Sequence, residues 1–191
     1  MHTTKHIVFL LIFTLSLHFA FAQKSFKGGI ILGAATCQTN GDDIGGFHKI
    51  GVTAGGFVSR EIAPQMSIDL ELRFTQKGAG DPNGYFKLNT GYVEVPVLFS
   101  YSFYQDFALK AGVGFAVEMY ESTEIGGYKS NPNDLQNFDI PAYIGVGYNI
   151  KERFGFDLRA SMSALPIRGH ISGRNYHHIC LYASAHIYIV K

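Results

Sequence analysis

The 191-residue chain is 47% hydrophobic and only 16% charged, a composition that excludes an intrinsically disordered protein. Its 16 basic and 15 acidic residues nearly cancel, so it lacks the basic field of a nucleic-acid-binding protein, and we expect no nucleic-acid partner. Sixteen phenylalanines, 11 tyrosines and 22 glycines, with no tryptophan, describe an aromatic-rich and glycine-rich chain of about one-domain size.

The first 22 residues have the pattern of a secretory signal peptide. Lys5 precedes an apolar run over residues 7–19, and small residues flank Phe21 before the expected cleavage at Gln23. The apolar run is shorter than the roughly 18–20 residues that a membrane-spanning helix needs. We therefore expect residues 1–22 to be removed and residues 23–191 to form one domain of an exported protein.

Apolar and polar residues alternate with a period of two along most of the remaining chain, which is the pattern of β-strands. The clearest case is residues 66–74, where five apolar side chains alternate with three charged ones and a serine. A strand places these two sets on opposite faces. The predicted strands, eight in all, are 26–37, 47–59, 65–76, 92–103, 107–120, 138–150, 153–165 and 177–190.

The predicted connections alternate between short and long. The short turns are 60–64, 104–106 and 151–152, and the long segments are 38–46, 77–91, 121–137 and 166–176. Outer-membrane barrels have short turns on the periplasmic side and long loops outside. The alternation therefore predicts an all-β, eight-stranded antiparallel up-and-down transmembrane β-barrel with both termini at the short-turn rim.

One face of the predicted strands carries no charge, whereas the other carries six acidic and five basic residues. An unpaired charge is costly to bury, so these groups cannot all lie in a dry apolar core. Their near balance predicts ion pairs inside a barrel. Eight residues are expected to form this lumen network, namely Asp69, Glu71, Arg73, Glu94, Lys110, Glu118, Asp157 and Arg159. The other three charges on this face are Lys27, Lys49 and Asp139.

Alternation alone allows two kinds of barrel. The uncharged face lies against lipid in a membrane barrel, and it lines a ligand cavity in a soluble lipocalin-like carrier. Aromatic residues gather on the uncharged face next to the short turns, where a membrane-interface girdle belongs. They are Phe26, Tyr101, Phe103, Phe107, Tyr148, Phe154 and Phe156. Glycines on the charged face leave room for long side chains in a narrow lumen, so both features favour the membrane barrel.

The segments Leu70-Glu71-Leu72-Arg73-Phe74-Thr75-Gln76-Lys77-Gly78 and Gly91-Tyr92-Val93-Glu94-Val95-Pro96-Val97-Leu98 contain paired strand motifs. They resemble those of the "porin family" outer-membrane β-barrel proteins of Bacteroidetes-type bacteria, a group that includes PorT-like proteins with an outer membrane protein beta-barrel domain. The resemblance implies an outer-membrane location, contact with outer-membrane lipid and lipopolysaccharide, and insertion by the barrel-assembly machinery. The chain ends on Lys191 rather than on the usual aromatic residue, so we expect an assembly signal that is either displaced to Tyr188 or weak.

The expected function is that of an integral outer-membrane barrel with a structural, adhesive or binding role through its long loops, because eight strands enclose a lumen that side chains just fill. We expect no enzyme, cofactor or metal. One alternative is a lipid A-modifying barrel enzyme, for which His170 and Ser172 have a faintly suitable spacing, although Gly173 replaces the expected asparagine. The other alternative is a secreted lipocalin-like carrier of apolar ligands, against which the lack of tryptophan argues.

The two cysteines of the chain offer a test of barrel closure. Cys37 ends the first predicted strand and Cys180 begins the last one, both at the long-loop rim and both on the charged face. An antiparallel register that pairs Lys27 with Val190 sets the cysteines opposite each other. Because an exported protein meets an oxidising compartment, a Cys37–Cys180 disulfide is possible, and two free inward thiols are the alternative.

Overall fold

The computed structural model describes residues 26–40, 46–47, 49–81, 85–130, 136–150, 153–166 and 177–190. The predicted signal peptide lies outside these residues. Within them, no helix is long and apolar enough to cross a bilayer.

Ten β-strands form one antiparallel sheet. Their bounds are β1 Phe26–Asn40, β2 Lys49–Ala63, β3 Met66–Gly80, β4 Phe86–Tyr104, β5 Phe107–Ile125, β6 Tyr128–Ser130, β7 Phe138–Asp139, β8 Pro141–Ile150, β9 Phe154–Ser163 and β10 His177–Val190.

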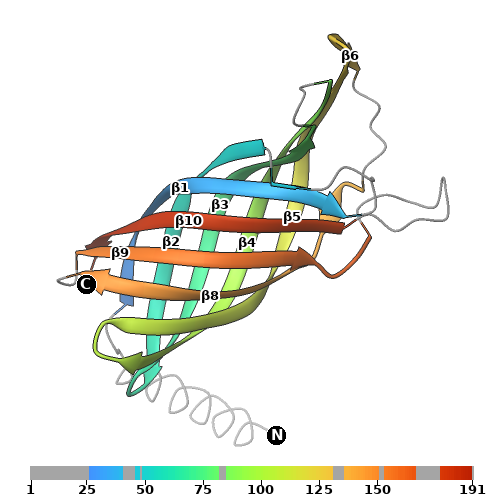
Figure 1. Cartoon of the computed structure of the whole chain (residues 1–191). Coiled ribbons are helices and arrows are strands. Elements are labelled where there is room, and N and C mark those ends of the chain that lie inside the picture. Colours follow the sequence, from blue (N-terminus) through green and yellow to red (C-terminus); the bar gives the residue numbers. More distant parts are fainter. Residues whose placement is uncertain are drawn as a thin grey trace, which may run out of the picture.

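The sheet closes into a barrel. Its strand order is β4-β3-β2-β1-β10-β9-β8-β5, and the pairing of β4 with β5 completes the ring (Figure 1). The short β7 precedes β8 and pairs with β5, as β8 does, while β6 extends β5 as a hairpin. The ring therefore counts eight antiparallel strands, and the predicted fold class is confirmed.

Two turns of two residues join strands at one rim. Pro64 and Gln65 connect β2 to β3, and Gln105 and Asp106 connect β4 to β5. The backbone of Gln65 has φ 67° and that of Gln105 has φ 39°, a left-handed conformation that allows each chain reversal. The predicted turn over residues 60–64 is thus shorter than expected, because β2 continues to Ala63.

Two segments predicted as long loops contain several strand residues. In the segment 77–91, β3 runs on to Gly80 and β4 begins at Phe86, and in the segment 121–137, β5 runs on to Ile125 and is followed by β6. Glycine and polar residues suggested loops, but these residues pair backbone to backbone with the neighbouring strands, and side-chain polarity alone does not oppose a strand. Residues 151–152 and 167–176 lie outside the described part of the chain.

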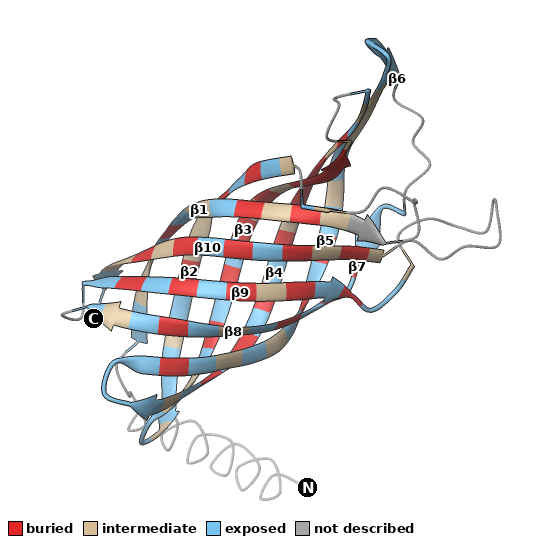
Figure 2. Ribbon diagram, viewed as in Figure 1, coloured by how far each residue is buried: buried red, intermediate tan, exposed pale blue. Residues whose placement is uncertain are grey.

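The uncharged face of the strands points outward. Leu70 and Leu72 are 49% and 59% exposed, whereas Asp69, Glu71 and Arg73 beside them are 6%, 1% and 1% exposed. Figure 2 shows the same alternation of buried and exposed residues along the strands of the ring. Charges inside and aliphatic side chains outside are the reverse of a soluble barrel. The structure therefore contradicts the lipocalin-like alternative.

The first and last strands meet at the seam of the barrel. β1 pairs with β10 so that Cys37 lies directly opposite Cys180, with a Cα–Cα distance of 4.1 Å and the two sulfur atoms bonded. The register near the other rim differs from the predicted one, because Gly28 rather than Lys27 pairs with Val190. A bulge between Gly28 and Gly29 absorbs the one-residue difference before it reaches the cysteines.

Replacing an outward residue at mid-strand by arginine tests the lipid-facing assignment. We expect Leu70→Arg to lower the free energy of unfolding from lipid vesicles by about 2–4 kcal/mol, because it places a charge in hydrocarbon. Tyr104→Arg is the control, since Tyr104 is 61% exposed but lies at the rim beside a turn. It should cost only about 0–1 kcal/mol in a urea titration. Equal losses in the two variants would contradict the assignment.

Removal of the cysteines tests the seam. We expect Cys37→Ser/Cys180→Ser to lower the unfolding free energy by about 2–5 kcal/mol, because the bond would close a long loop of the unfolded chain. A reducing agent should lower the stability of the wild type equally and leave the variant unchanged. Two alkylated thiols per chain in denatured, unreduced wild type would show that no disulfide forms.

Candidate functional site

A continuous row of ion pairs, here called the ion-pair chain, fills much of the lumen. Acidic and basic side chains alternate along it, and each neighbouring pair has an N···O distance between 2.7 and 3.8 Å. From the short-turn end, its members are Asp69, Lys110, Asp157, Arg159, Glu71, Arg73, Glu94, Lys77 and Asp139. Each inner member has an opposite charge on both sides, which offsets the cost of burying it.

The strongest link of the ion-pair chain crosses the lumen. Arg159 on β9 donates two hydrogen bonds of 2.9 Å to the two carboxylate oxygens of Glu71 on β3. β10, β1 and β2 separate these strands in the ring, so the contact joins opposite walls. Such a bidentate pair fixes both position and orientation.

Serine hydroxyls hold both ends of the ion-pair chain. Ser59, Ser67 and Ser100 donate hydrogen bonds of 2.6, 3.2 and 3.1 Å to the carboxylate of Asp69. At the other end, Ser163 donates a hydrogen bond of 2.7 Å to Asp139. Each terminal carboxylate has only one cation of the ion-pair chain beside it. The hydrogen bonds from these neutral hydroxyls compensate for the missing second cation.

Aromatic rings pack against the cations in the outer half of the lumen. The guanidinium of Arg73 lies 5.1 Å from the ring centroid of Tyr143 and 4.4 Å from that of Tyr182. The ammonium of Lys77 lies 4.7 Å from the ring centroid of Tyr92. These rings add cation–π attraction and fill the space between the charges.

Glycines on neighbouring strands admit the two arginines. Gly55 pairs with Arg73, and Gly145 pairs with Arg159. A Cβ atom at Gly55 would lie 2.2 Å from the carbonyl oxygen of Leu72, and one at Gly145 would lie 2.5 Å from that of Leu158. The close strand approach therefore excludes any larger residue at these two positions.

Seven of the eight residues predicted for the lumen network lie in the ion-pair chain, and Glu118 is the exception. Glu118 lies across from Tyr92, next to a bulge, and makes no ion pair with any residue that the structure describes. The buried ammonium of Lys77 contacts Glu94 and Asp139 instead. The prediction missed Lys77 because it ended the third strand at residue 76, although the continued alternation through Thr75 and Lys77 could have revealed it.

The structure does not test the residues considered for catalysis. His170 and Ser172 lie outside the described residues. Across the parts of the chain that are described, no three histidine, cysteine or acidic side chains are grouped to hold a metal ion.

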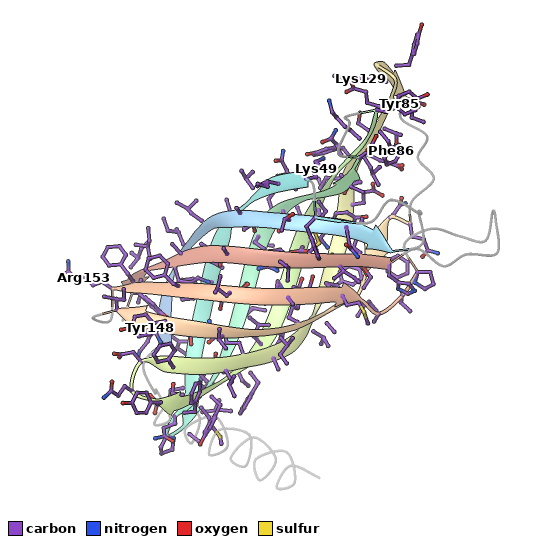
Figure 3. The ribbon with its side chains drawn as sticks, viewed as in Figure 1. Lys49, Tyr85, Phe86, Lys129, Tyr148 and Arg153 are labelled. Carbon is purple, nitrogen blue, oxygen red and sulfur yellow. A yellow bond between two sulfur atoms is a disulfide. The ribbon has the colours of Figure 1, made fainter. Side chains whose placement is uncertain are left out.

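A hairpin-based sheet projects from the long-loop end of the barrel, here called the arm (residues 85–91, 120–125 and 128–130). Its strands pair Phe86 with Ile125 and Ile125 with Tyr128, and its tip turns at Gly126 and Gly127, whose φ angles are 57° and 88°. Figure 3 places Tyr85, Phe86 and Lys129 on this projection, at the opposite end from Tyr148 and Arg153.

Hydrogen bonds fix the arm at its tip and its base. At the tip, the amide of Gly126 donates a bond of 2.8 Å to the carbonyl oxygen of Tyr85. At the base, the ammonium of Lys49 donates a bond of 2.9 Å to the carbonyl oxygen of Leu88 and also contacts the side chain of Asn89. The arm is therefore an ordered extension of the barrel wall.

Removing the most connected acid tests the ion-pair chain. Glu94 contacts Arg73, Lys77 and Thr75, so Glu94→Gln leaves two buried cations short of a partner. We expect a loss of about 3–5 kcal/mol in the free energy of unfolding from lipid vesicles. The second change in Glu94→Gln/Lys77→Met should recover part of that loss.

The control for this prediction is Glu124→Gln, which removes a partly exposed carboxylate from the arm. It should change the unfolding free energy by less than about 1 kcal/mol. If Glu94→Gln were as stable as this control, the prediction would be wrong, because water in the lumen would then screen the charges of the ion-pair chain.

Comparison with solved structures finds small outer-membrane barrels. Ail, the attachment invasion locus protein of Yersinia pestis, is 12% identical, with a TM-score of 0.57 over 87% of this chain and 100% of Ail. Ail in complex with the heparin analogue sucrose octasulfate gives a TM-score of 0.54 at the same identity and the same coverage of both chains. Neisserial surface protein A (NspA) is 12% identical, with a TM-score of 0.55 over 86% of this chain and 97% of NspA. At these identities the likeness establishes the fold alone.

Comparison of the sequence with curated proteins yields no match. The family described as "Outer membrane protein beta-barrel domain" matches residues 13–165, which is most of the chain. Together with the inverted placement of charged and apolar residues, this match shows that the chain is an integral outer-membrane β-barrel and belongs to the outer membrane protein beta-barrel domain family.

Proposed function

We propose that this barrel is a non-enzymatic surface protein whose arm binds a protein partner outside the cell. The observation that carries the proposal is the exposure of two tyrosines on the arm, 64% for Tyr85 and 85% for Tyr128. Both lie on ordered backbone that projects beyond the ring of strands (Figure 3).

Membrane anchoring does not account for these tyrosines. Interfacial aromatic residues lie level with the lipid headgroups. Phe103, Phe107 and Phe154 are exposed at the short-turn ends of their strands, where we expect that level. Tyr85 and Tyr128 instead belong to the part of the sheet that has left the barrel. An exposed tyrosine offers a large contact area at a low entropic cost, which explains its enrichment in protein interfaces.

The order of the arm supports binding rather than passive exposure. The Gly126–Tyr85 and Lys49–Leu88 hydrogen bonds hold the backbone on which the tyrosines stand. A preorganised surface loses less conformational entropy on binding than a free loop does. The fold likeness to a protein named for attachment and to another named as a surface protein agrees with this role.

The filled lumen argues against transport as the main role. The ion-pair chain and the rings of Tyr92, Tyr143 and Tyr182 occupy the middle and the outer half of the barrel interior. Eight strands enclose little more volume than such side chains need. We therefore place the function on the outer surface rather than in a channel.

Adherence of cells that carry the barrel in their outer membrane tests the proposal. We expect Tyr85→Ser/Tyr128→Ser to reduce adherence to immobilised extracellular proteins about tenfold or more, because interface tyrosines often contribute more than about 1 kcal/mol each. Tyr104→Ser is the matched control, since Tyr104 is 61% exposed at the other rim. Equal surface levels of the three proteins are required. Unchanged adherence of the arm variant would refute the proposal.

A further inference from the structure

A polar cavity of about 260 Å³, here called the inner cup, opens at the short-turn end of the lumen. Residues close to the turns and strand ends surround it, among them Lys27 on β1, Gln65 in the β2–β3 turn, Asn149 on β8 and Tyr188 on β10. In an outer-membrane barrel this rim faces the periplasm. The inner cup is thus separated from the arm by the whole length of the barrel.

Small side chains explain why the cavity exists. Its wall includes Ser59, Ser67, Ser100, Ser102 and Ala108, at positions equivalent to those that arginine, lysine and tyrosine occupy farther along the lumen. Side chains of this size cannot fill a barrel of eight strands. Large side chains therefore fill the middle of the lumen, and small ones leave its periplasmic end open.

The hydrogen bonds already made by the serines of the wall determine which hydrogen-bonding groups a ligand needs. Three of the serines already donate their protons to Asp69. Their remaining capacity is that of acceptors, because a hydroxyl has one proton and two lone pairs. These three serines therefore favour a ligand that brings hydrogen-bond donors, while Lys27, Gln65 and Asn149 on the same wall can donate to its acceptors.

The charges of the wall select a neutral ligand. Lys27 and Lys110 line the inner cup together with Glu61 and Asp69, so two basic and two acidic groups balance. Lys110 is moreover held by Asp69 and Asp157. A cationic or anionic ligand would meet a like charge in this small space, whereas a ligand with several hydroxyl groups would not.

One side of the inner cup is a fixed aromatic ring. The hydroxyl of Tyr188 donates a hydrogen bond of 3.1 Å to the side chain of Asn149. Its ring meets that of Phe57 edge to face, with the centroids 5.1 Å apart. Such a ring offers an apolar surface beside polar groups, and the C–H face of a pyranose requires that combination.

We propose that the inner cup binds one neutral pyranose unit, presented from the periplasm. The cavity is smaller than the roughly 300–1,000 Å³ of pockets for drug-sized ligands, which limits the buried part to a single sugar ring. The same chemistry is available from a free sugar or from the end of a cell-wall glycan. The inference is independent of the partner proposed for the arm.

NMR titration of the full barrel in lipid nanodiscs tests the inner cup. N-acetylglucosamine is the neutral probe, and glucosamine and glucuronic acid are the cationic and anionic probes of similar size. We expect saturable shifts of amides around residues 100–110 and Asn149 with the neutral sugar, at least tenfold weaker binding of the charged sugars, and nuclear Overhauser contacts to the ring of Tyr188 in the wild type. Absence of both the shifts and the contacts would overturn the proposal.

Two filling variants provide the second arm of the experiment. Ser102→Leu and Ala108→Leu narrow the inner cup and should weaken binding at least tenfold, whereas Ala111→Leu enlarges a side chain on the outer face of the same strand as Ala108 and should not. Binding that persists in both filled variants would also overturn the proposal. Tighter binding of a neutral glycan fragment than of the single sugar assigns the ligand to the cell-wall glycan, and equal binding assigns it to a free sugar.

Discussion

The need to pair nine charges inside the lumen governs the structure of this barrel. Arg73, Glu94 and Arg159 are almost completely buried, and an isolated charge in that environment costs several kcal/mol. Their pairing requires β3, β4 and β9 to keep one register, because a slip of one residue would turn every charge toward lipid. The glycines opposite Arg73 and Arg159 follow from the same need, since a larger residue would push the strands apart.

The sequence was sufficient to predict the fold because, away from the strand ends, charged and apolar side chains alternate regularly along the strands of the ring. Every charged position of residues 66–74 points inward in the structure, as predicted. The extension of β3 to Gly80 and of β5 to Ile125 was not predicted, because the period of two is lost after Lys77 and after Glu118, where the residues no longer divide into an apolar and a charged face. The Glu71–Arg159 contact could not be predicted from strand neighbours, because it crosses the lumen between strands that do not pair.

The two ends of the lumen differ because the size of the inward residues changes along the strands. Tyr92, Tyr143 and Lys77 fill the outer half. A partner at the outer end would therefore bind to the surface of the barrel and to the arm rather than inside the lumen. Serines replace them toward the periplasm, and the cavity that remains ends at Asp69 and Lys110. A ligand in the inner cup and a partner on the arm would therefore act on separate surfaces with the ion-pair chain between them.

The two strands that close the barrel carry no member of the ion-pair chain. Its members lie on β3, β4, β5, β7 and β9, so none stands on β1 or β10, the two strands that close the barrel. The backbone ladder between these strands is irregular near Gly28, where a bulge interrupts it. Cys37 and Cys180 face each other at the opposite end of the same seam. The disulfide therefore links two strands that carry no member of the ion-pair chain.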